Sequence, residues 1–331
     1  MTIAFTLCSN NYLAQAKTLG DSFLEYHPDA KFIIGLVDRY DATFDYDVFK
    51  RFEIIPVEDI QIDNLDALIA KYNIVELNTC VKPAYIHYIF RNYRAGKVLY
   101  LDPDILVTGY FEEVLDLLDQ YNIVLTPHIC TPVDDEFAPT DYQTLRGGVF
   151  NLGFIALSNY NLITPFLNWW HERVIKYGYA DFTKNMFYDQ VWINYVPVMF
   201  DDYYILKHPG YNMAVWNLHE RWLNAEHENY MVNDIFPLKF YHFSGYKYDQ
   251  PEKICNYEGA RFDFEKRPGL KKIYTVYQEK LLKNKIDIIS GLSVFFRDIK
   301  LKRLLKKPGY AERILIRLKL TTRFFLKGSL H

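Results

Sequence analysis

Lys97-Val-Leu-Tyr-Leu-Asp-Pro-Asp104 joins a short apolar run to two carboxylates that stand one residue apart. The run from Lys97 to Leu101 predicts a buried β-strand. Pro103 fixes its own φ and restricts the residue before it, which preorganises the turn. Carboxylates placed in this way can converge on one hard divalent cation. The stretch therefore predicts a strand that ends in a metal-binding turn, with an Asx-turn that only terminates the strand as the alternative.

Segments typical of strands and helices alternate around this turn. Strands are expected at 3–7, 31–37, 52–57, 97–101, 122–126, 149–157 and 238–242, and helices at 13–26, 78–93, 111–120, 159–177 and 188–195. This alternation predicts an α/β fold with a mostly parallel central sheet and flanking helices. Ligands of such sheets bind outside the carboxyl ends of the strands, where Asp102 and Asp104 stand. A second acidic pair, Asp45 and Asp47, follows no apolar strand and is interpreted as a solvated loop.

Composition narrows the function classes. Half of the 331 residues are hydrophobic and 17% are aromatic, which is typical of a folded protein with a large core. The net charge of -3 gives no general affinity for nucleic acid, so no nucleic-acid partner is expected. Four scattered cysteines without a CxxC pair, and no signal-like segment, predict a cytoplasmic protein.

The character of the sequence changes near residue 267. We expect a domain over residues 1–266 and a helical, basic amphipathic extension over residues 267–331. In the last thirty or so residues, lysines and arginines alternate with leucine, isoleucine and phenylalanine. This pattern favours a peripheral position on an anionic membrane surface. A solvated helical tail or a subunit contact is the alternative.

Five sequence blocks carry a resemblance to a known family. The blocks are Thr6-Leu-Cys-Ser-Asn-Asn-Tyr12, Asn78-Thr-Cys-Val-Lys-Pro83, Leu101-Asp-Pro-Asp-Ile-Leu106, Phe150-Asn-Leu-Gly-Phe154 with Asp189-Gln190, and His242-Phe-Ser-Gly245. In this order they resemble the GT-A fold glycosyltransferases of family 8, which include glycogenin and bacterial lipopolysaccharide glycosyltransferases. The resemblance covers about residues 1–248. It implies a GT-A fold and a nucleotide-sugar donor, with UDP as the expected nucleotide.

The resemblance assigns the first two blocks to the nucleotide. Thr6, Ser9 and Tyr12 would cradle it, with the tyrosine ring near the base. Asn78 and Lys82 would contact the nucleotide or its phosphates. Core packing of Tyr12 and a surface position for Lys82 are the alternatives.

The resemblance also completes the metal site. His242 would join Asp102 and Asp104 around Mn²⁺, with Mg²⁺ as the competitor. Gly245 would allow the diphosphate to approach the backbone. Lys247 would bind the diphosphate, but it stands five residues after the histidine instead of six and no Pro-Trp follows. This block therefore departs from the family pattern.

The remaining blocks are assigned to catalysis at the sugar. Asn151, Asp189 and Gln190 would contact the donor sugar near its anomeric carbon. A structural hydrogen bond for Asn151 and a helix N-cap role for Asp189 are the alternatives. The segment from Tyr211 to Arg221 is rich in rings and amides and is interpreted as a wall for the acceptor or donor sugar.

These features predict a hexosyltransferase in surface polysaccharide or glycan biosynthesis. It would transfer a sugar to a saccharide or lipid-linked acceptor with retention of configuration, as family 8 enzymes do. A non-catalytic nucleotide-sugar or carbohydrate-binding protein is one alternative. A sugar nucleotidyltransferase is another, although Cys8-Ser-Asn-Asn11 offers no glycine-rich phosphate loop.

Overall fold

The centre of the fold is a seven-stranded sheet. The computed structural model describes residues 1–224 and 229–299. The sheet contains β1 (Thr2–Cys8), β2 (Lys31–Leu36), β3 (Glu53–Pro56), β4 (Lys97–Leu101), β6 (Ile123–Pro127), β7 (Phe150–Ser158) and β10 (Tyr203–Ile205). Its order is β10-β6-β7-β4-β1-β2-β3, and only β7 runs antiparallel to its neighbours. The predicted α/β fold with a mostly parallel sheet is confirmed.

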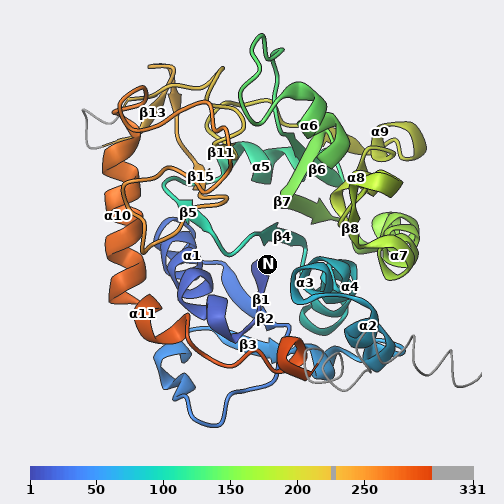
Figure 1. Cartoon of the computed structure of the whole chain (residues 1–331). Helices are drawn as coiled ribbons and strands as arrows, with labels where there is room; N and C mark the ends of the chain where they lie inside the picture. The colour runs from blue at the N-terminus through green and yellow to red at the C-terminus, as the bar shows by residue number, and fades with distance from the viewer. Residues whose placement is uncertain (225–228, 300–331) are drawn as a thin grey trace, which may run out of the picture.

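Helices cover both faces of this sheet (Figure 1). The helices are α1 (Leu13–Tyr26), α2 (Leu65–Lys71), α3 (Ile74–Cys80), α4 (Lys82–Tyr93), α5 (Glu112–Leu117), α6 (Asp141–Gly147), α7 (Tyr160–Tyr177), α8 (Gln190–Ile193), α9 (Val196–Met199), α10 (Leu270–Lys283) and α11 (Ile286–Ile289). Ile3, Phe5 and Leu7 of β1 share a core cluster with α4 and α7. Ala4 and Cys8 join the opposite cluster with α1 and α10. The two-residue period of the strand thus builds one core on each face.

Three small sheets complete the fold. The first contains β5 (Ile105–Val107), β11 (Met213–Ala214) and β15 (Phe240–His242). The second contains β12 (Leu223–Asn224), β13 (Met231–Val232) and β14 (Phe236–Pro237). The third contains β8 (Ala180–Asp181) and β9 (Met186–Phe187). In the first of them β15 pairs antiparallel with β5, so that His242 lies opposite Ile105. Because β5 follows the acidic turn directly, this ladder brings the histidine to the carboxylates.

Two predicted helices differ from the structure in their bounds. The helix expected over 78–93 consists of α3, which begins earlier, and α4. Pro83 has no N–H to donate to the preceding turn, so a new helix begins beside it. The helix expected over 188–195 is shorter in the structure, where α8 spans Gln190–Ile193, and α9 begins after the predicted end, with Pro197 in its first turn. The strand expected over 238–242 is confirmed only from Phe240 onward.

The C-terminal helices pack on the rest of the fold. Residues of α10 and α11 share the core cluster that contains α1. Beyond them, Asp38 accepts a hydrogen bond from Phe295 N at 2.9 Å, and Asn10 Nδ2 donates to Ser293 O at 3.2 Å. These hydrogen bonds therefore join the chain near residue 295 to the segments that follow β1 and β2. The proposed domain boundary at residue 266 stays a prediction.

The predicted membrane-binding segment lies outside the described residues, because it falls almost entirely within residues 300–331. Within residues 1–224 and 229–299, none of the helices combines the length and the hydropathy that crossing a membrane requires.

Candidate active site

The acidic turn and His242 meet at the carboxyl end of β4. His242 Nε2 lies 3.1 Å from Asp104 Oδ1 and 3.8 Å from Asp102 Oδ2. One potential ligand atom from each of the three residues lies within 4.8 Å of the other two. Phe243 N also donates to Asp104 O at 2.8 Å, which fixes the turn to β15. The structure thus brings together the three residues predicted to hold a metal.

Neighbouring side chains orient these three groups. Tyr100, two residues before Asp102 on the same face of β4, donates its hydroxyl to Asp102 Oδ1 at 2.6 Å. Asn212 Oδ1 lies 3.3 Å from His242 Nδ1, which leaves Nε2 directed at the carboxylates. The ring of Trp216 packs edge-on against the imidazole at 5.1 Å between centroids. The histidine therefore has one ring orientation, with its second nitrogen already engaged.

The charges around Asp102, Asp104 and His242 favour a bound positive charge. Burial alone would lower the pKa of His242, but the charges of Asp104 and Asp102 outweigh it and raise the pKa. Burial raises the pKa of Asp102. Burial also acts to raise the pKa of Asp104, but the charge of His242 and its hydrogen bond hold the pKa of Asp104 below its usual value. Two carboxylates and an imidazole in this arrangement form a donor set that suits Mn²⁺ or Mg²⁺.

The residues predicted to cradle the nucleotide lie at the same end of the sheet. Tyr12, at the end of η1 (Asn10–Tyr12), is 39% exposed, so the core-packing alternative is wrong. Burial and, after it, the charge of Asp104 raise the pKa of Tyr12. Asn78 donates to Ser9 Oγ at 3.1 Å, while Thr6 is completely buried. The exposed member of this group is the tyrosine that was expected beside the base.

Lys82 and Asp189 form a buried ion pair. Their Nζ and Oδ2 atoms are 2.6 Å apart, and both side chains are almost fully enclosed. Lys82 also donates to Leu152 O at 2.9 Å, and its ammonium lies over the Tyr100 ring. The surface position considered for Lys82 is therefore wrong. Asp189 stands at the N-cap of α8 but its side chain caps nothing, so the capping alternative is wrong as well.

Asn151 and Gln190 use their polar atoms within the protein. Asn151 Oδ1 accepts from Gly153 N and from Asn212 Nδ2, both at 3.0 Å, and its Nδ2 lies 3.1 Å from His128 Nε2. Burial lowers the pKa of His128 to about 4, so its neutral ring can accept this bond. Gln190 Nε2 donates to Gly147 O at 2.6 Å. These contacts match the structural alternative for Asn151, and its contact with a sugar stays a prediction.

The residues after β15 border the carboxylates. Gly245 has φ +76°, in the region that favours glycine. Lys247 is exposed, and its charge is among the causes that lower the pKa of Asp104. The role of Lys247 as a diphosphate ligand stays a prediction.

Two further interpretations can be compared with the structure. The sugar-binding wall expected at 211–221 is wrong for Tyr211, Asn212 and Asn217, because these side chains are buried. Asn212 instead contacts His242, and Asn217 Nδ2 donates to Asn212 O at 3.0 Å. The second acidic pair is exposed: Asp45 accepts from Asp47 N at 2.9 Å and caps η2 (Tyr46–Phe49). Its interpretation as a solvated loop is confirmed.

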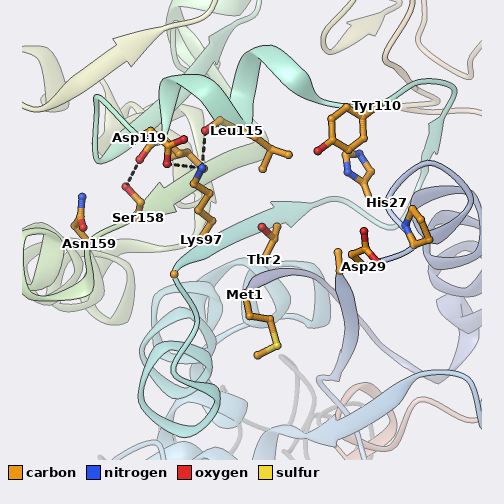
Figure 2. Close-up of a pocket in the computed structure, with 14 residues that line it drawn as sticks. Met1, Thr2, His27, Asp29, Lys97, Tyr110, Leu115, Asp119, Ser158 and Asn159 are labelled. Carbon is orange, nitrogen blue, oxygen red and sulfur yellow. Dashed lines mark hydrogen bonds and ion pairs between the residues drawn. The ribbon is translucent and has the colours of Figure 1, made fainter.

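A separate cavity of about 590 Å³ lies at the opposite end of the sheet (Figure 2). Thr2 and Lys97, at the beginnings of β1 and β4, line it together with His27 and Tyr110. Figure 2 shows the His27 and Tyr110 rings stacked and Lys97 paired with Asp119. None of the residues that line the cavity belongs to the carboxylate site.

The sequence interpretation missed the roles of three residues. Tyr100 could have been found, because it stands two residues before Asp102 along the same extended run. Asn212 was expected in a sugar-binding wall, but it contacts His242 from a distant segment instead. Tyr257 gave no signal, because it comes from the irregular stretch between β15 and α10.

Comparison with known proteins gave relatives of low identity. No family model matches the sequence. The chain is 24% identical to the uncharacterized protein YfnF of Bacillus subtilis over 285 residues, which cover 85% of this chain and 92% of YfnF. It is 23% identical over 272 residues to the uncharacterized protein YfnD of the same organism, covering 78% and 84% of the two chains.

The similar solved structures are glycosyltransferases. The glycosyltransferase GlyE of Streptococcus pneumoniae TIGR4 is 15% identical with a TM-score of 0.47; the match covers 88% of this chain and 65% of GlyE, less than two thirds of its length. The galactosyltransferase LgtC, solved with donor and acceptor sugar analogs, is 16% identical with a TM-score of 0.46, covering 84% and 95%. At these values the functional assignment rests on the residues of the site.

Proposed function

We propose that the chain is a metal-dependent glycosyltransferase of the GT-A type. It transfers a hexose from a nucleotide-diphosphate sugar, with UDP as the nucleotide, to a saccharide or lipid-linked acceptor. The observation that supports this most is the convergence of Asp102, Asp104 and His242 at the carboxyl end of β4. The exposed ring of Tyr12 follows β1, which runs parallel to β4, and so lies at the same end of the sheet.

Asp102, Asp104 and His242 would hold Mn²⁺ or Mg²⁺, which as a Lewis acid would stabilise the diphosphate leaving group. The protein's own groups orient this site. Tyr100 fixes one oxygen of Asp102, and Asn212 engages Nδ1 of His242. The ring of Tyr12 offers a face on which a base can stack.

The sugar-binding side of the proposed site includes the buried pair of Lys82 and Asp189. Asp189 and Gln190 belong to the block that resembles the family's sugar-contacting residues, and Asp189, the N-cap residue of α8, is paired with Lys82 of α4. We propose retention of the anomeric configuration on the strength of the resemblance alone. NMR of the product decides this, because an inverted linkage would rule out the retaining scheme.

The enzyme assay is release of UDP from a panel of UDP-sugars in the presence of Mn²⁺. We expect turnover by the wild-type protein and its loss in Asp104→Ala. Asp47→Ala is the matched control, because it removes an exposed carboxylate from the other Asp-x-Asp sequence. Binding of UDP-sugar without turnover would indicate a binding protein instead. Pyrophosphate release from UTP and a sugar phosphate would indicate a nucleotidyltransferase.

We propose a cytoplasmic location with peripheral attachment to the inner face of the membrane, which would suit a lipid-linked acceptor. The basic and apolar residues of 300–331 support this proposal by their pattern alone. Deletion of residues 300–331 should abolish sedimentation with vesicles that contain phosphatidylglycerol. Unchanged sedimentation would remove the support for membrane attachment.

A further inference from the structure

A tyrosine from the irregular stretch after β15 lies beside the proposed diphosphate position. The Tyr257 hydroxyl is 2.6 Å from Ser244 Oγ. A Cβ placed on Gly245 would lie 3.0 Å from Tyr257 Cζ and 3.1 Å from Cε1. The end of the ring that carries the hydroxyl thus packs against the glycine expected to face the diphosphate.

Two sets of hydrogen bonds hold the segment that carries this tyrosine. At its start, Asn256 N donates to Gly245 O at 2.9 Å. At its end, Arg261 donates to both oxygens of Asp135, and its NH2 group also donates to Phe137 O at 2.9 Å. A ring fixed on both sides in this way is preorganised, so little conformational entropy is lost when it contacts a ligand.

The hydroxyl is accessible and suited to donate. Tyr257 is 42% exposed, so its ring borders solvent instead of the core. Partial burial and the negative charge of Asp104 raise the pKa of Tyr257, whereas the hydrogen bond with Ser244 lowers it. An ordinary phenol is already protonated at neutral pH. The contact with Gly245, three residues after His242, places the ring near the carboxylate turn. A neutral O–H donor at this place would stabilise a phosphoryl oxygen.

We propose that Tyr257 is a donor-binding residue whose hydroxyl donates a hydrogen bond to the diphosphate of the nucleotide sugar. This inference rests on the proposed function, because it requires a diphosphate at the Asp102–Asp104–His242 site. It also accounts for the altered sequence after His242: the chain supplies a phenol from residue 257 beside Gly245, in addition to the shifted Lys247.

The test is binding of UDP to the full-length protein with saturating Mn²⁺, measured by calorimetry. Tyr257→Phe keeps the ring and removes the donor, so we expect the Kd for UDP to rise about tenfold, the usual effect of losing a hydrogen bond to a charged group. The Kd for Mn²⁺ alone should stay within about twofold of wild type, because the phenol is not a metal ligand.

Two control variants separate ligand binding from a structural role. Ser244→Ala removes the side chain that the Tyr257 hydroxyl contacts within the protein. Tyr248→Phe removes a comparable contact between a tyrosine and a serine, Ser290, at a place outside the proposed site. Both should bind UDP within about twofold of wild type. Equal weakening in Ser244→Ala and Tyr257→Phe would show that the Tyr257–Ser244 bond only shapes the turn, and would overturn the inference.

The remaining outcomes are distinct. If the wild-type protein binds UDP with Mn²⁺ and Tyr257→Phe binds it equally well, the inference is wrong while the proposed function stands. If the wild-type protein binds neither UDP, GDP nor ADP in the presence of Mn²⁺, the proposed function fails and the inference fails with it.

Discussion

Gly153 lies directly against the ring of His242. A Cβ at position 153 would be 2.4 Å from His242 Cε1 and 2.7 Å from Asn151 Oδ1. Real Cβ atoms do not approach other atoms this closely, so any side chain at this position must displace the imidazole or the amide. The glycine on β7 thus sets the position of a proposed metal ligand on β15.

We predict that Gly153→Ala destabilises the protein by about 1–3 kcal/mol, the usual range for overpacking. Because the displaced group is His242, the variant should also lose Mn²⁺ affinity. Urea denaturation measures the first effect, and electron paramagnetic resonance of free Mn²⁺ measures the second. Gly96→Ala is the control, since a Cβ there meets only ordinary contacts at 3.7 Å. Unchanged Mn²⁺ affinity in Gly153→Ala would contradict the proposed role of His242.

Removal of the Tyr100 hydroxyl should weaken metal binding while leaving the ring in place. Tyr100→Phe loses the bond to Asp102 Oδ1, and groups that orient metal ligands typically contribute a factor of about 10–100 in affinity. We expect the Kd for Mn²⁺ to rise within this range. Tyr72→Phe removes another buried hydroxyl, bonded to Val174 O, and should leave the Kd for Mn²⁺ unchanged. Equal metal affinity in Tyr100→Phe and wild type would show that Asp102 needs no such orientation.

Breaking the ion pair of Lys82 and Asp189 should be costly. Lys82→Met leaves a carboxylate buried without its partner, and we predict a loss of about 3–5 kcal/mol in the free energy of unfolding. The double variant Lys82→Met with Asp189→Leu removes both charges and should recover part of this loss. Urea denaturation of the single and double variants gives the coupling energy. If the double variant is as unstable as the sum of the two single ones, the pair contributes no coupling.

Acidification should destabilise the protein through His27. Burial lowers the pKa of His27 to about 4, from an ordinary value of 6.5. The unfolded chain therefore takes up a proton below pH 6.5, whereas the folded chain does so only near pH 4. The free energy of unfolding falls as the pH drops through this window, by about 1–2 kcal/mol at pH 5.

His27→Phe isolates this contribution. A phenylalanine can keep the stack between Phe23 and Tyr110 but has no proton to bind. We expect the loss of unfolding free energy between pH 7 and pH 5 to be smaller in the variant than in wild type. The same pH dependence in both proteins would exclude His27 as a cause.

Elements with a clear period could be predicted from the sequence, whereas contacts between irregular segments could not. The strand from Lys97 to Leu101 and the helix from Leu13 to Tyr26 have the predicted bounds, because local hydrophobic periodicity determines them. The break between α3 and α4 was missed although Pro83 marks it. The strands β11 to β14 are two residues long and have no period to detect.

The candidate site shows the same division. The two aspartates could be predicted because they follow a strand-like run, whereas the place of His242 beside them was implied by the family resemblance. The burial of Lys82 could not, since it depends on Asp189 more than a hundred positions further along the chain. Nor could the place of Tyr257, which is determined by the distant contact between Arg261 and Asp135.

The ladder between β5 and β15 has a consequence for the newly synthesised chain. The ribosome synthesises both aspartates of the acidic turn well before residues 240–242, so β5 has no partner until those residues emerge. The three groups cannot share an ion before then. In a growing chain the proposed cation site therefore stays incomplete until β15 has been synthesised, and the proposed activity cannot begin before that.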